Sequence, residues 1–171
     1  MNIMNLQKQL IIYILAIVAG LALTGCASGF KKACKSGNDP EQIHAYIAKG
    51  EDPNKSLGGA SGFSPLGHAV RSNKNPEIIK ALLKAGANPN ATPNAAMIVT
   101  PLQIAAYYNK PIAAQVLIEG GADVNFCPAS LLPAGSMVFN KWVAMTPYQI
   151  AVAKGNAAVA EILLKAGAGA R

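Results

Sequence analysis

A glycine followed by acidic or amide residues recurs along this chain, and this feature constrains the fold most. The clearest copies are Gly-Ala-Asn-Pro-Asn at 86–90 and Gly-Ala-Asp-Val-Asn at 121–125, and related segments occupy 50–54 and 167–170. The first residues of the four copies are 36, 35 and 46 positions apart. A period of this length is typical of a solenoid, in which each repeat packs only on its neighbours.

Other residue types recur in step with the glycines. Hydroxyl residues followed by Pro occur as Ser64-Pro65-Leu66, Thr100-Pro101-Leu102 and Thr146-Pro147-Tyr148. Small residues recur at Ala33, Ala69, Ala105 and Ala151, and apolar pairs at 46–47, 82–83, 117–118 and 163–164. Ser or Thr before Pro favours a helix start, and Gly favours a left-handed helix stop. The pattern predicts pairs of helices that approach closely at alanine.

The combined pattern resembles the ankyrin repeat family. The resemblance implies an all-α ankyrin-repeat solenoid of about four helix-turn-helix repeats with finger loops. These repeats would span about 29–54, 55–90, 91–125 and 126–171. The family's His after Thr-Pro-Leu is replaced by Gly67, Gln103 and Gln149. Because Gln can still donate a hydrogen bond across repeats and Gly cannot, we expect the weakest link at Gly67.

The segment 126–145 extends the third finger by an insertion. It has twenty residues, whereas the two equivalent segments, 55–63 and 91–99, have nine each. It contains the only Trp of the chain and two of its four Phe residues. Insertions in repeat arrays map to loops on one face, often the binding face. Two interpretations remain open: the insertion binds a partner, or it folds back and packs on a repeat interface.

Residues 1–25 are predicted to be a targeting segment. An unbroken run of fourteen residues at 10–23 is apolar or Gly, which suits a secretory signal and is short for a membrane span. The run ends at Leu23-Thr24-Gly25-Cys26. This resembles a bacterial lipoprotein signal peptide, which implies cleavage before Cys26 and lipidation of its thiol and new amine. An ordinary signal peptide and an uncleaved short anchor are the alternatives.

The resemblance makes 26–171 the mature ankyrin-repeat domain. It implies a lipoprotein of the bacterial cell envelope that faces the periplasm, in the outer membrane rather than the inner one. The chain has a formal net charge of +7, and loss of Lys8 with the signal would leave +6. A basic balance in this compartment favours an acidic partner or an anionic membrane surface and disfavours nucleic acid.

No enzyme or metal signature is present in the sequence. His44 and His68 fall in different repeats, with no Cys or carboxylate beside them at metal-ligand spacing. We therefore expect no catalysis, no metal and no cofactor. Cys34 and Cys127 also fall in different repeats, so we expect no disulfide between them and a buried Cys34.

Binding is the remaining activity. In ankyrin families the exposed residues after the inner-helix alanines and the finger tips form the binding surface. Carried over by position, the candidate protein-binding residues are Arg71, Tyr107, Tyr108, Lys154, Met97, Phe126, Phe139 and Trp142. Tyr, Trp and Arg dominate interface energetics, although the tyrosines could instead just shield the inner helix. Replacing Tyr107 and Tyr108 by Ala should weaken partner binding and leave the melting temperature almost unchanged.

The sequence thus predicts a non-enzymatic protein-binding module, tethered by lipid on Cys26, whose partner is a protein with an acidic or mixed acidic-apolar surface. Bacterial ankyrin lipoproteins resemble immunity proteins that neutralise toxic effectors such as lipases, so this role is one candidate. A scaffold or stress-protective partner of a periplasmic protein is a second. A secreted effector that binds host proteins is a third.

Overall fold

The computed structural model describes residues 26–58, 62–72, 75–92, 99–128 and 141–169, and within these ranges it is all-helical. The helices are α2 (Cys26–Ser36), α3 (Pro40–Ala48), α4 (Pro65–Ser72), α5 (Pro76–Lys84), α6 (Pro101–Tyr107), α7 (Pro111–Glu119), η4 (Lys141–Ala144), α8 (Pro147–Ala153) and α9 (Ala157–Lys165). The predicted all-α solenoid of helix pairs is confirmed. The predicted targeting segment, 1–25, lies outside the described residues, and α2 begins three residues before the expected start of the first repeat.

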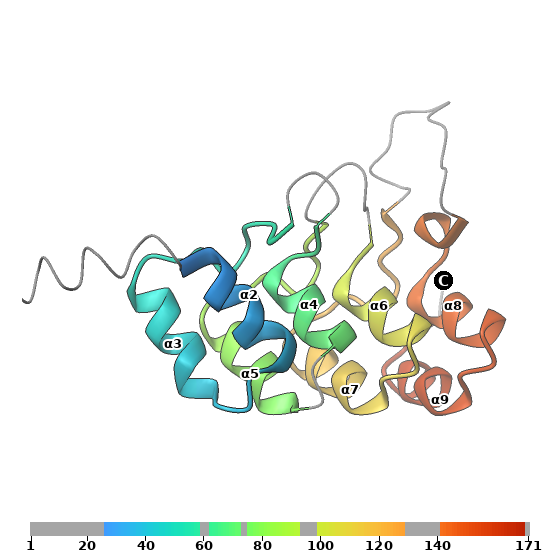
Figure 1. The fold of residues 1–171 in the computed structure, drawn as a ribbon. Coiled ribbons are helices and arrows are strands. Elements are labelled where there is room, and N and C mark those ends of the chain that lie inside the picture. Colours follow the sequence, from blue (N-terminus) through green and yellow to red (C-terminus); the bar gives the residue numbers. More distant parts are fainter. Residues whose placement is uncertain (1–25, 59–61, 73–74, 93–98, 129–140, 170–171) are drawn as a thin grey trace, which may run out of the picture.

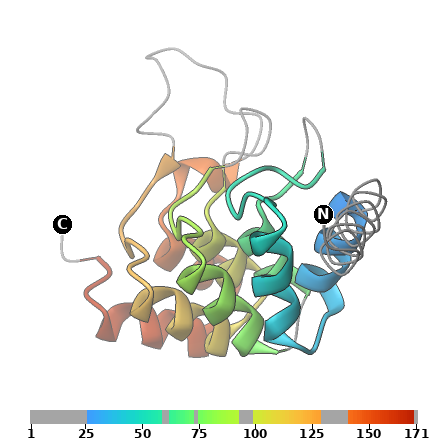
Figure 2. The same ribbon diagram turned by 90° about the vertical axis from the view of Figure 1, so that its left-hand side faces the viewer.

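The helices form two layers (Figure 1). The inner helices α2, α4, α6 and α8 contact one another in series, and so do the outer helices α3, α5, α7 and α9. Each inner helix also packs on the outer helix that follows it. The described parts of the connections between pairs rise on the same side of the two layers (Figure 2). This arrangement places the starts of α4, α6 and α8 beside the finger loops (Figure 1).

The helix starts follow the predicted chemistry. Pro is at the first helical position of six helices in the described ranges, from α3 to α8. At three inner helices the preceding hydroxyl oxygen accepts a hydrogen bond from an amide three residues later: Ser64 from Gly67 at 3.1 Å, Thr100 from Gln103 at 3.2 Å, and Thr146 from Gln149 at 3.3 Å. Such caps satisfy amides that have no partner inside the helix.

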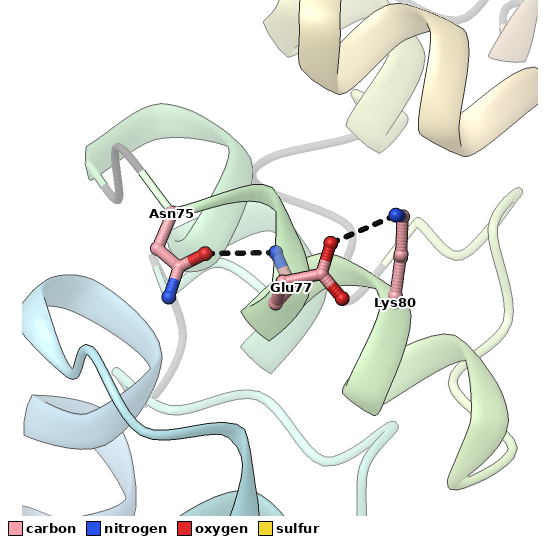
Figure 3. A network of polar contacts seen from close by, with 3 residues as sticks. All are labelled: Asn75, Glu77 and Lys80. Carbon is pink, nitrogen blue, oxygen red and sulfur yellow. Dashed lines mark hydrogen bonds and ion pairs between the residues drawn. The ribbon is translucent and has the colours of Figure 1, made fainter.

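Asparagine and aspartate serve the same purpose at the outer helices α5 and α3. At α5, the Asn75 side chain accepts from the amide of Glu77 at 3.0 Å, and Glu77 in turn pairs with Lys80 at 2.8 Å (Figure 3). Asp39 accepts equivalently from Glu41 at the start of α3. Glu77 and Glu41 lie in the first turn of their helices, where a negative charge interacts favourably with the helix dipole.

Small inner residues and aliphatic outer residues form the core. Ala69, Ala105 and Ala151 have no exposed surface, and neither do Leu82, Leu117 and Leu163. Leu83, the second member of its apolar pair, packs toward the next repeat: a Cβ on Gly120 of the third repeat would lie 2.6 Å from Leu83. Leu164, in the last described pair, is 51% exposed.

A ladder of asparagine side chains joins the repeats along the turns that follow the outer helices. The side-chain amides of Asn54, Asn90 and Asn125 donate to the carbonyls of Gly86, Gly121 and Gly167 at 3.1, 3.5 and 3.2 Å, respectively. Their side-chain oxygens accept from the amides of Asn88, Asp123 and Gly169 at 2.8, 2.9 and 3.0 Å. Each glycine has a φ near +90°, the predicted left-handed stop. The recurring Asn therefore fixes the spacing between neighbouring repeats.

Within the described ranges, every helix is too short or too polar to traverse a bilayer.

Candidate binding site on the inner helices

Three aromatic side chains meet where α6 ends. Tyr107 is the last residue of α6, Tyr108 caps it, and Trp142 lies in η4. The Tyr107 ring centroid is 4.9 Å from that of Tyr108 and 5.3 Å from that of Trp142, both edge to face. Edge-to-face packing is the favoured geometry of aromatic pairs and holds the rings in a defined arrangement. The three rings form an ordered apolar surface on the inner helices.

This surface is hollowed by a cavity of about 330 Å³. The cavity is lined by Phe63, Val99, Gln103, Ile104, Tyr107, Tyr108, Trp142 and Ile150. Phe63 precedes α4, and Ile150 comes from α8, so the cavity extends from the segment before α4 across α6 to α8. A concave, mostly apolar cavity with a few polar groups is the usual form of a binding site. We call these residues the aromatic cavity.

Two cations flank the aromatic cavity. The guanidinium of Arg71, in the last turn of α4, lies 5.3 Å from the Phe63 ring centroid and 5.7 Å from that of Tyr108. The ammonium of Lys154, which caps α8, lies 4.5 Å from the Tyr107 ring centroid. Cations within about 6 Å of a ring are attracted to its face. Both side chains are exposed, so their charges stay available to a partner.

Gln103 holds the insertion against α6. Its side-chain oxygen accepts from the Thr100 amide at 2.9 Å, and its side-chain nitrogen donates to the carbonyls of Trp142 and Met145 at 3.1 and 2.7 Å. Gln103 is only 1% exposed, so these bonds satisfy an otherwise buried amide. They confirm the expected link across repeats, and they position the backbone that carries Trp142.

In the described helices, negative charge is confined to the outer layer. The charged residues of the inner helices are all basic: Lys31, Lys32 and Lys35 in α2 and Arg71 in α4. The helical carboxylates Glu41, Glu77, Glu119 and Glu161 are all on outer helices. The ion pairs among the described residues, Glu77–Lys80 and Glu161–Lys165, also lie on outer helices. The inner surface therefore presents positive charge that this part of the chain does not neutralise by ion pairing.

His68 lies in α4, in the basic part of the inner surface. It is 7% exposed, and its ring packs edge to face on Phe63 at 5.6 Å. Burial, followed by the charges of Lys31, Lys35 and Arg71, lowers the pKa of His68 to about 4. His68 is therefore neutral near pH 7 and takes no part in anion binding as a cation.

Five of the eight predicted binding residues come together: Arg71, Tyr107, Tyr108, Trp142 and Lys154. Phe126 is half-buried and does not line the cavity. Met97 and Phe139 lie outside the described residues, as does the part of the insertion at 129–140. Trp142 both packs on the core and lines the cavity, so packing and binding are compatible for this residue. Five further residues line the cavity and are not among the eight predicted ones: Phe63, Val99, Gln103, Ile104 and Ile150.

In the part of the chain that the structure describes, His, Cys, Asp and Glu form no group that could hold a metal ion. Cys34 and Cys127 are both thiols, and Cys34 is buried, as predicted. Burial raises the pKa of the Cys34 thiol to about 12, which keeps it protonated and unreactive.

Comparison with known proteins agrees with this architecture. A family model described as ankyrin repeats (3 copies) matches residues 30–127, which is more than half of the chain. The match covers the first three helix pairs and ends before η4, α8 and α9. No curated protein matches the chain. The ordered repeats, the paired helices and the family match together place this chain in the ankyrin repeat family.

Proposed function

We propose that this chain is a non-enzymatic protein-binding module, that the aromatic cavity is the centre of its binding surface, and that lipid on Cys26 holds it at the bacterial envelope. Ankyrin repeats are protein-interaction modules, typically without catalytic activity. The observation that carries the proposal is the aromatic cavity itself, with Arg71 and Lys154 on its two sides. Tyr, Trp and Arg in one ordered cluster are the residue types of interface hot spots.

The chemistry of the inner surface supports a partner with acidic and apolar groups. An apolar side chain would enter the aromatic cavity, and carboxylates beside it would pair with Arg71 and Lys154. Charge pairs at an interface chiefly set association rate and specificity, while the buried apolar contact limits dissociation. The partner's complementary surface therefore combines both features.

The role we propose for this binding is inhibition of a toxic effector, such as a lipase, delivered to the envelope by rival cells. It rests on the resemblance of the lipid signal and the repeats to such immunity proteins. A lipid anchor would hold the inhibitor at the membrane where a lipase acts. A scaffold that supports an envelope protein of the same cell is the competing role.

Affinity purification separates these roles. The tagged chain is purified from membranes, and the stoichiometric partner is identified by mass spectrometry. A toxin whose activity falls on binding the chain supports inhibition, whereas an envelope protein that remains active in the complex supports the scaffold. A secreted effector would instead be recovered from the culture medium and not from the membrane fraction.

The lipid anchor has its own test. Cells are grown with a radiolabelled fatty acid, and the chain is compared with its Cys26→Ser variant. If Cys26 is lipidated, the wild-type chain carries the label and migrates at its mature size. The Cys26→Ser variant then carries no label and does not migrate at that size. Equal electrophoretic size, with no label on either chain, contradicts the anchor.

A further inference from the structure

Resting on the proposed function, we propose that the inner surface binds one polypeptide segment in a fixed placement. An acidic stretch of the partner lies over α2 and α4, and a large apolar side chain about four residues away fills the aromatic cavity. The proposal specifies the order and spacing of acidic and apolar residues in the partner's sequence. Binding at the aromatic cavity alone does not require such an order.

The acidic stretch is assigned to a second hollow on the inner surface. This hollow, of about 500 Å³, is lined by Lys31, Lys32, Lys35, Ser36 and Ser72. The three lysines form no ion pair with the described carboxylates. The positive field here is strong enough that Lys31, Lys35 and Arg71 contribute to the lowered pKa of His68. Ammonium and hydroxyl groups around one hollow fit carboxylate oxygens as ligands. We call these five residues the basic hollow.

The apolar end of the segment is assigned to the aromatic cavity. Neither α6 nor α8 contains a charged residue, and the cavity walls are rings and aliphatic side chains. Arg71 lies between the basic hollow and the cavity, because it belongs to α4 and its guanidinium reaches Tyr108. Charge thus decreases along the inner surface from α2 to α6.

The spacing follows from the packing of the helices. The basic hollow lies between α2 and α4, and the aromatic cavity is centred near α6, about one and a half helix spacings away. Packed helices are about 9 Å apart, so the two sites are roughly 14 Å apart. An extended chain covers about 3.4 Å per residue, which makes the separation roughly four residues.

An anionic bilayer is a different occupant for the same lysines. It is disfavoured because Ser72 of α4 shares the hollow with the lysines of α2, so the charges surround a recess between helices. A recess suits a narrow acidic chain better than a broad, flat surface.

The test uses a synthetic peptide of four Glu, a spacer of about three Gly and Ser residues, and one Leu. The chain is used as purified in mild detergent. Trp142 is the only Trp of the chain and lines the cavity, so its fluorescence reports the arrival of the Leu. We expect a change in Trp142 emission with the peptide, and at least about tenfold weaker binding when Leu is replaced by Ala.

Double-mutant cycles locate each end of the peptide. Lys31→Gln with Lys35→Gln should weaken binding several-fold, and the loss should vanish when the peptide's Glu residues are replaced by Gln. Tyr108→Ala should be coupled to the Leu and not to the Glu residues. Lys84→Gln with Lys165→Gln removes the same charge from outer helices and should leave binding unchanged.

Three results overturn the proposed placement: no response of Trp142 at millimolar peptide, no coupling between the lysines and the Glu residues, or equal binding without the spacer. A fourth result would overturn the placement in favour of a lipid surface. In it, phosphatidylglycerol in the micelles displaces the peptide, and tight binding to these micelles requires Lys31 and Lys35. The proposed function fails separately, if the purified partner binds the Tyr108→Ala chain as well as the wild type. A partner that needs Tyr108 but not the lysines leaves the function standing and removes only the placement.

Discussion

Adjacent side chains in the candidate binding site have different surroundings. Tyr107 is half-buried and packs on the core, whereas Tyr108 is 43% exposed. The repeat register placed both on the inner surface, because each follows the inner-helix alanines Ala105 and Ala106 at the end of α6. The repeat register could not show which of the two rings is packed, because this depends on the contact between Tyr107 and Trp142 of the insertion.

The two tyrosines should therefore respond differently to substitution. Tyr108→Ala should change the free energy of unfolding by no more than about 0.5 kcal/mol, as expected for an exposed side chain. Tyr107→Ala should cost about 2 kcal/mol because it removes a ring packed against Trp142 and the core. This revises the sequence-based expectation of an unchanged melting temperature for the pair. Urea unfolding of the two single variants measures the difference, and equal losses would contradict it.

His68 gives the fold a specific pH dependence. Its pKa is lowered to about 4 in the folded chain from an ordinary value of 6.5, so the unfolded chain binds its proton first as the pH falls. The stabilisation from neutral His68 is complete above pH 6.5 and is lost between pH 6.5 and 4. A shift of this size corresponds to about 3 kcal/mol.

Urea unfolding of the wild type and of His68→Phe, at pH 7 and pH 4, isolates this effect. Because carboxylates titrate in both proteins, the relevant quantity is the free energy of unfolding that each protein loses between pH 7 and pH 4, compared between the two. The wild type should lose about 3 kcal/mol more than the variant. Parallel pH profiles would exclude the contribution of His68.

At the element scale, the helix pairs could be predicted because their signals are local. Ser or Thr before Pro, the small inner residue and the final glycine each act within a few residues of the chain. The asparagine ladder could not be derived in this way, since Asn90 bonds to a turn about thirty residues later. The position of Trp142 also escaped prediction, because the insertion has no counterpart in the other repeats and Gln103 fixes it from α6.

The ladder predicts a measurable loss of stability. Asn90→Ala removes two hydrogen bonds to the following repeat and leaves the Asp123 amide without this acceptor. At about 0.5–1.5 kcal/mol for each bond, the expected cost is about 1–2 kcal/mol. Gln42→Ala, on the exposed face of α3, serves as the control and should be nearly neutral. Thermal unfolding of both variants decides, and an Asn90→Ala variant as stable as the control would refute the role of the ladder.

At the scale of the whole molecule, each helix pair is stabilised mainly by its neighbours. In the described residues, the last pair, α8 and α9, packs mainly on the α6–α7 pair, and Leu164 is exposed. We expect this end to open locally before the middle of the array.

Leu163→Ala tests this expectation, because Leu163 is fully buried in α9. The cavity should cost about 2–4 kcal/mol and should raise amide hydrogen exchange in α8 and α9 much more than in α2 to α5. Uniform acceleration across all helices would indicate one global unfolding unit instead.

The proposed binding of a protein partner through the aromatic cavity can be measured directly. The most direct measurement is the affinity of the co-purified partner for the wild type, for Tyr108→Ala and for Ile112→Ala, an exposed apolar residue on outer helix α7. We expect at least about tenfold weaker binding for Tyr108→Ala and unchanged binding for Ile112→Ala. Wild-type affinity in the Tyr108→Ala chain, or a loss confined to Ile112→Ala, would contradict it.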